Sequence, residues 1–142
     1  MSKIGFVLIL GFIVLTIAVL GYFKAIPGTN DREGDFPRIE IGPDVFDFGE
    51  ISYGDVVSYS FRVKNSGQET LEIRRVATSC ACTTARISQD RLEPGEEAEL
   101  LVSYDSAAMA LHGSGREERI IYVRSNDPVN PQVEVTIYAT VK

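Results

Sequence analysis

Cys80 and Cys82 are the residues of this chain best suited to chemistry, and no other cysteine occurs among its 142 residues. In an extended segment, positions i and i+2 point to the same face with Cα atoms roughly 6.6 Å apart. That separation is near the upper limit for a disulfide. A local turn would bring the two Cα atoms closer together. The pair therefore predicts a C-x-C disulfide that is either structural or, because a short ring is strained, easily reduced.

Two other interpretations of the cysteines remain open. Adjacent thiolates can chelate Cu(I) or Zn(II), and Met109 and His112 supply further possible ligands in an Ala-rich loop. This alternative predicts a copper site made by Cys80, Cys82, Met109 and His112. The remaining interpretation is that the cysteines are small apolar residues packed where a strand turns between sheets, because free cysteine is commonly buried.

The rest of the chain offers no set of residues suited to catalysis. His112 is the only histidine, so it would have to serve as base for every nucleophile. Glu117 and Glu118 lie between Arg116 and Arg119, a charge pattern typical of a solvated face. We therefore predict that the protein is not an enzyme, has no catalytic residues and needs no cofactor.

The segments around the cysteines have the pattern of an all-β domain. From Arg38 onward the apolar residues fall in short runs, several with period two, separated by turn signals. Arg74-Arg75 interrupts one alternation, which predicts a bulge or a change of sheet. Pro94-Gly95 suits the centre of a type II turn. About seven strands, or eight, in roughly 105 residues predict an immunoglobulin-like β-sandwich.

A different segment precedes this domain. The 20 residues from Ile4 to Phe23 carry no charge, and as a helix they would span about 30 Å, the thickness of a bilayer's hydrocarbon core. The run is longer than the apolar part of a secretory signal and lacks its small-residue cleavage site. We therefore predict an uncleaved transmembrane anchor over residues 1–24 that contacts membrane lipid, a linker over 25–37 and the sandwich over 38–142.

Charge and order suggest where the domain lies. Basic residues flank the apolar run on both sides, so charge alone does not orient it. A single N-terminal segment followed by one long folded domain is the usual arrangement of a signal anchor. We expect a single-pass protein of the cytoplasmic (inner) membrane, with its N-terminus inside and its domain periplasmic. All 20 acidic residues but only 12 of the 14 basic ones lie at or beyond Asp31, so binding of nucleic acid is not expected.

Five short elements follow one another in the domain and together carry a resemblance. They are Phe46-Asp47-Phe48-Gly49, Asn65-Ser66-Gly67, Ser79-Cys80-Ala81-Cys82-Thr83, Pro94-Gly95-Glu96 and Ser125-Asn126-Asp127-Pro128. In this order they resemble an uncharacterised bacterial family of exported immunoglobulin-like domains, catalogued as a domain of unknown function, over about residues 36–142. That family is similar in architecture to Hydin-type and major-sperm-protein-like sandwiches. Ala81 stands where the family often has glycine.

The resemblance implies the fold but supplies no established activity. By analogy with related sandwiches, it implies a binding or assembly module. We therefore expect a membrane-anchored extracytoplasmic scaffolding module, an accessory or assembly subunit of a membrane or cell-envelope complex, whose partner is another membrane or envelope protein. The alternative is a thiol-redox or copper-handling protein that acts through Cys80 and Cys82.

Overall fold

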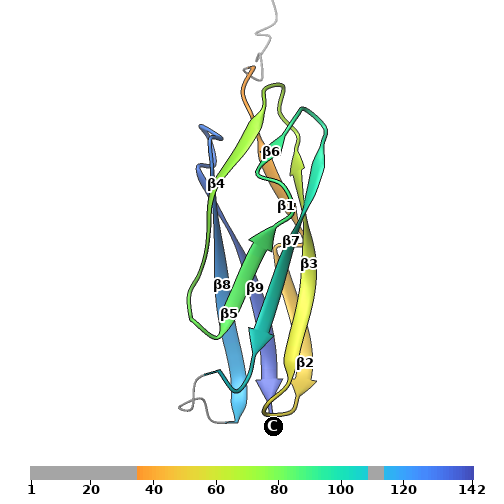
Figure 1. Cartoon of the computed structure of the whole chain (residues 1–142), viewed down its shortest axis with the longest axis vertical. Helices are drawn as coiled ribbons and strands as arrows, with labels where there is room; N and C mark the ends of the chain where they lie inside the picture. The colour runs from red at the N-terminus through yellow and green to blue at the C-terminus, as the bar shows by residue number, and fades with distance from the viewer. Residues whose placement is uncertain (1–34, 109–113) are drawn as a thin grey trace, which may run out of the picture. The chain divides into compact units, whose positions relative to one another are not determined.

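The computed structural model of this chain describes residues 35–108 and 114–142, which form nine β-strands (Figure 1). The strands are β1 (Ile39–Gly42), β2 (Val45–Ile51), β3 (Val56–Asn65), β4 (Leu71–Thr78), β5 (Thr83–Ile87), β6 (Arg91–Leu92), β7 (Glu97–Asp105), β8 (Gly115–Ser125) and β9 (Gln132–Val141). The predicted all-β class is thus confirmed. Among the described residues no helix is long and apolar enough to cross a membrane. The predicted anchor, from Ile4 to Phe23, lies outside them.

The strands form two sheets with the order of an immunoglobulin-like sandwich. One sheet has the order β1-β3-β7-β5, and the other has the order β2-β9-β8-β4-β6. The parallel pair is β2 with β9, and the remaining pairs are antiparallel. Nine strands replace the expected seven or eight, because β5 shows no clear alternation and β6 has two residues. The start of the described chain and its C-terminus lie at opposite ends of the domain (Figure 1).

The core lies between the sheets and is built from the alternating apolar positions of the strands. Its most deeply buried aliphatic and aromatic residues, at most 1% exposed, come from both sheets. They include Phe61, Val63, Leu100 and Val102 of one sheet and Ile121, Val123, Val135 and Ile137 of the other. Two local predictions are confirmed: the register of β4 shifts between Ile73 and Arg75, and Gly95 has a φ of 83°, as a type II turn requires.

Asn65, at the end of β3, is fully buried and uses its whole side-chain amide. Its Nδ2 donates to the carbonyl oxygens of Glu69 at 2.8 Å and Leu92 at 2.9 Å. Its Oδ1 accepts from the backbone N–H of Gly67 at 3.0 Å and of Arg38 at 3.3 Å. A buried amide satisfied in this way stabilises one conformation of the segments it joins, because each lost bond would leave a polar group unpaired. Asn65 therefore joins the residue before β1 to the β3–β4 loop and to β6.

Asp127 lies in the β8–β9 connection of the second sheet and accepts a hydrogen bond from the start of β1, in the first sheet. The residue is 1% exposed. Its Oδ2 accepts from the N–H of Ile39 at 3.0 Å, and its Oδ1 accepts from Val129 at 2.8 Å and Asn130 at 3.0 Å. Burial by itself raises the pKa of Asp127, but these backbone hydrogen bonds outweigh it and hold the pKa below its usual value.

We predict that Asp127→Asn destabilises the fold by about 2 kcal/mol at neutral pH, because the new amide turns an NH₂ group toward the Ile39 N–H. The wild-type carboxylate, with its lowered pKa, contributes fully above the pKa of an unfolded aspartate, about 3.9. That contribution is lost as the pH falls through the folded value. Urea unfolding of the full-length chain in mild detergent should therefore show a difference in the free energy of unfolding between wild type and Asp127→Asn. That difference should narrow below about pH 4. The exposed Asp90→Asn is the matched control, and an equal loss in both variants would contradict this role.

Candidate functional site

The cysteine pair lies in the connection from β4 to β5, where the chain passes from one sheet to the other. The Thr83 N–H donates to the Cys80 carbonyl at 3.2 Å, which closes a turn. The Thr78 hydroxyl lies 3.0 Å from the carbonyl oxygens of both Cys80 and Thr83. The Cα atoms of Cys80 and Cys82 are consequently 5.3 Å apart, well inside the range for a disulfide.

The two sulfur atoms lie within bonding distance of each other but differ in exposure. Cys82 is 2% exposed. Cys80 is half-buried and lies between the exposed residues Ser79 and Ala81. The oxidation state that the pair adopts in the cell stays a prediction.

Arg119 of β8 brings a positive charge to the buried sulfur. Its Nε donates to the Cys82 Sγ at 3.1 Å, and its Nη1 donates to the Glu118 carbonyl at 2.6 Å. Its Nη2 lies 2.5 Å from the Glu117 carboxylate. The guanidinium carbon is 5.5 Å from the centroid of the Tyr104 ring. Burial raises the pKa of the Tyr104 hydroxyl, and the charge of Arg119 opposes that rise.

The prediction that residues 116–119 form a solvated face is wrong for Arg119, which is only 9% exposed. The inward positions of β8 alternate, and Arg119 lies two residues before the fully buried Ile121. That parity was the available sequence signal, and the charges around Arg119 obscured it. A buried guanidinium is costly unless it is paired, so Glu117 and the Cys82 sulfur account for its position.

The proposed metal ligands are not brought together by the described part of the structure. Met109 and His112 lie outside residues 35–108 and 114–142. Within those residues no group of three or more His, Cys, Asp or Glu side chains could hold a metal ion. The copper site therefore stays a prediction.

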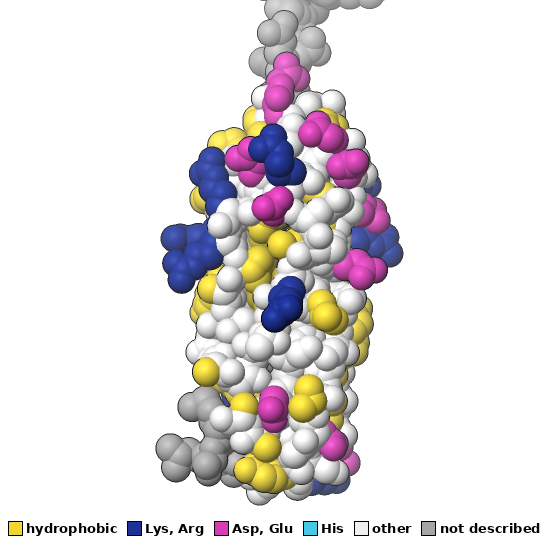
Figure 2. Space-filling model, in the orientation of Figure 1, with side chains coloured by type: hydrophobic (Ala, Val, Ile, Leu, Met, Phe, Trp, Pro, Cys, Tyr) yellow, Lys and Arg dark blue, Asp and Glu magenta, His cyan; other side chains and the backbone are white. Residues whose placement is uncertain are grey.

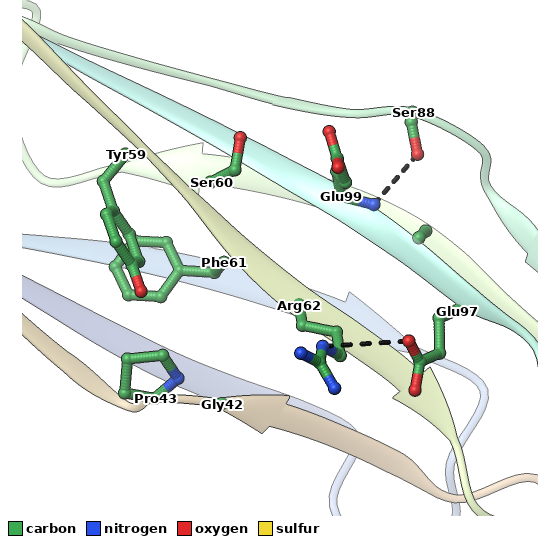
Figure 3. Close-up of a pocket in the computed structure, with 10 residues that line it drawn as sticks. Gly42, Pro43, Tyr59, Ser60, Phe61, Arg62, Ser88, Glu97 and Glu99 are labelled. Carbon is green, nitrogen blue, oxygen red and sulfur yellow. Dashed lines mark hydrogen bonds and ion pairs between the residues drawn. The ribbon is translucent and has the colours of Figure 1, made fainter.

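A second candidate site is a groove of about 480 Å³ along β3. In Figure 3, Tyr59 and Phe61 point to one side of β3 and Ser60 points to the other. Arg62 extends toward Glu97, with Nε 3.7 Å from the carboxylate. The other lining residues are Gly42, Pro43, Ser88, Ala98 and Glu99.

The groove lies beside the part of β3 that does not pair with β1. β1 pairs only with residues 62–65 of β3, because Pro43 has no N–H to continue the ladder and β2 joins the other sheet. The Ser66 N–H donates toward β1, to the Arg38 carbonyl at 2.9 Å. Backbone groups alternate sides along an antiparallel strand. The N–H and C=O groups of Ser58 and Ser60 therefore face an open edge, which no other strand of residues 35–108 and 114–142 covers.

The sheet order and the crossing of β2 to the second sheet define the class of protein: an immunoglobulin-like sandwich, a fold that it shares with a solved PapD-like domain. A protein of unknown function from Porphyromonas gingivalis W83 is similar, with a TM-score of 0.67 and 22% identity over 73% of this chain and 46% of that one. The chain thus spans less than half of that protein. It belongs to the family of proteins of unknown function DUF1573, whose model matches residues 39–141.

Two further structures support the fold alone, because their identities are low. The ASH/PapD-like domain of human CEP192 has a TM-score of 0.54 and 11% identity over 73% of this chain and 84% of that one. The YadV chaperone has a TM-score of 0.56 and 14% identity over 73% and 52%. Some similar structures are hydrolases, of which the chain covers about a third or less. No curated protein matches the sequence.

The disulfide and copper hypotheses make different predictions for the purified full-length chain. We predict no free thiol before reduction, two after it, and no stoichiometric copper by metal analysis. One bound copper per reduced chain, lost in Met109→Leu/His112→Gln, would support the copper alternative instead. The same double substitution should leave the thiol counts unchanged.

Proposed function

We propose that this protein is a membrane-anchored, extracytoplasmic immunoglobulin-like binding module, an accessory or assembly subunit that acts without turnover. The observation that carries the proposal is the open half of β3 beside the groove. An unpaired strand edge offers a row of backbone donors and acceptors to another chain. Here Ser58 and Ser60 present those groups, since β1 ends at Gly42.

The occupant that fits this edge is an extended segment of another membrane or envelope protein. Strand addition supplies main-chain hydrogen bonds, and a neighbouring pocket that takes alternate side chains supplies specificity. The groove has an apolar wall of the half-buried Tyr59 and the exposed Pro43, and a charged end at Arg62 and Glu97. A segment that places an apolar side chain on the wall and a polar one at the end would use both.

The comparisons support a binding module without deciding it. The similar YadV protein is a chaperone, and the Porphyromonas protein has no stated activity. The hydrolases among the similar structures show that the fold by itself does not exclude catalysis. Our proposal of a non-enzymatic role rests on the residues of the site.

Surface charge supports a protein partner over nucleic acid. On the face drawn in Figure 2, Lys and Arg are interspersed with Asp and Glu, mostly over the half where the described chain begins. Both signs alternate there, and no continuous basic stripe crosses that face. A nucleic-acid surface would gather positive charge in such a stripe.

We predict that Ser60→Pro abolishes partner binding but preserves the fold, because it removes an N–H that faces the open edge and not β7. The matched control is Ala85→Pro, which removes an outward N–H from β5 at the other edge of the same sheet. Binding is measured in cells with a benzophenone amino acid in place of Arg62, which lines the groove. Thermal unfolding of each variant checks the fold.

The groove position should form an adduct with one envelope protein, and the same label in place of the exposed Arg86 of β5 should not. Ser60→Pro should reduce the adduct at least tenfold, whereas Ala85→Pro leaves it unchanged. Equal adducts at positions 62 and 86, or an adduct unaffected by Ser60→Pro, would contradict binding at the β3 edge.

The anchor is tested separately. We predict that the full-length chain sediments with membranes and that a chain lacking residues 1–24 does not. In a Cys80→Ser/Cys82→Ser background, an impermeant maleimide should label Thr29→Cys in intact spheroplasts, and Ser2→Cys only after permeabilisation. The reverse labelling would show the opposite orientation, and a soluble full-length chain would exclude the anchor.

A further inference from the structure

We propose that Cys80 and Cys82 form a thiol–disulfide exchange site whose reaction partner is a dithiol, with Arg119 as the positioning residue that stabilises Cys82 as a thiolate. The proposal does not rest on the binding role of β3. It rests on the unequal exposure of the two sulfurs and on the guanidinium that contacts the buried one.

Exposure decides which sulfur an incoming thiolate attacks. Exchange requires the attacking thiolate to approach one sulfur along the S–S bond. Cys82 is 2% exposed, so it is closed to a protein or small thiol. Cys80 is half-buried between two exposed residues. Attack therefore occurs at Cys80, and Cys82 is the leaving group.

Arg119 acts on that leaving group. Its guanidinium is permanently charged, and its Nε lies 3.1 Å from the Cys82 Sγ. A cationic donor stabilises a thiolate more than it stabilises a neutral thiol or a disulfide sulfur. A better-stabilised thiolate leaves faster, and the reduced form becomes more favourable.

Other charges near Cys82 modify this effect. On β8, the Glu117 carboxylate pairs with Arg119 at 2.5 Å and disfavours a second negative charge. On β7, Tyr104 stays neutral because burial raises its pKa, and Asp105 contributes a further carboxylate beside it. Arg119 and Glu117 thus act on the thiolate in opposite directions, which provides paired variants with opposite expected signs.

Exchange with the dithiol proceeds through two successive substitutions at sulfur. One thiolate of the dithiol bonds to the Cys80 Sγ, the Cys80–Cys82 bond breaks, and Cys82 leaves with the electron pair as a thiolate beside Arg119. The second thiolate of the dithiol then attacks the dithiol sulfur that is bonded to Cys80. The mixed disulfide breaks, and Cys80 is released as a thiolate. Two electrons pass to the pair, the dithiol becomes a disulfide, and solvent supplies protons to the released thiolates according to pH.

The test measures the oxidised fraction of the full-length chain at equilibrium with glutathione buffers. Arg119→Met keeps the aliphatic stem and removes the charge. We expect it to shift the equilibrium about tenfold toward the disulfide at neutral pH, because a hydrogen bond to a charged group contributes a free energy of about that size. Glu117→Gln should shift it the other way. The Arg86→Met variant, at an exposed arginine of β5, is the control.

A pH titration separates this role from a merely structural one. Thiolate absorbance of the reduced chain should rise at a pH about one unit higher in Arg119→Met than in wild type, and at a lower pH in Glu117→Gln. The equilibrium difference between wild type and Arg119→Met should also disappear at acidic pH, where Cys82 is protonated in both. Unchanged titrations in both variants would overturn the role of Arg119, even if the variants lose stability.

Single-cysteine variants test the direction of attack. Cys82→Ser leaves Cys80 and should form a mixed disulfide with oxidised glutathione, whereas Cys80→Ser leaves the buried Cys82 and should not. Equal reaction of both would overturn the assignment of Cys80 as the attacked sulfur. A pair that stays oxidised in excess dithiothreitol under native conditions would overturn the exchange site as a whole, whatever the result of the β3 crosslinks.

Discussion

The burial of Asn65 and Asp127 is the constraint on which the rest of the domain depends. Neither side chain can lie in the interior unless its polar atoms are bonded, and both use those bonds on the segment that begins β1, at Arg38 and Ile39. These hydrogen bonds fix the four-residue strand β1 against β3 in one register. Since the register fixes where β1 ends, it also fixes where the edge of β3 opens. Two buried polar side chains, one at the end of β3 and one in the β8–β9 connection, thus determine the position of an exposed backbone edge.

The five elements that carry the family resemblance differ in what the fold needs from them. Asn65 holds β1, Gly95 supplies the positive φ of its turn, and Asp127 holds the N-terminus of β1. Gly49, with a φ of 71°, lies at the register shift within β2, where its N–H donates to the Asp47 carboxylate at 2.8 Å. The cysteine element is different. A turn between sheets needs neither a sulfur pair nor a buried cation, and an apolar side chain in place of Arg119 would avoid its desolvation. The element therefore carries atoms that packing does not explain.

The sequence determines the strands whose faces alternate, together with the β4 bulge and the turn at Pro94-Gly95, because local spacing carries that information. It does not reveal β5 and β6, whose few residues are held by pairing with β7 and β4. From the sequence, a turn that brings Cys80 and Cys82 together is only one of several options. The contact of Arg119 with Cys82 joins positions 37 apart, and only the pairing of whole sheets brings them together. The alternation of residues predicts which face of the sheet a side chain lies on, but it does not predict which residues that side chain contacts.

The two candidate sites share a strand but use different parts of it. β7 pairs with β3 on one side and with β5 on the other. Ser60, at the open edge, is opposite Leu101, whereas Tyr104, beside the guanidinium, is opposite Thr83. A strand added to the β3 edge would bond to backbone that points away from β7, so it need not disturb the residues around Cys82. Conversely, exchange at Cys80 changes a turn outside the β3 ladder. The proposed binding and the proposed thiol–disulfide exchange are therefore physically separable in this domain, and neither requires the other.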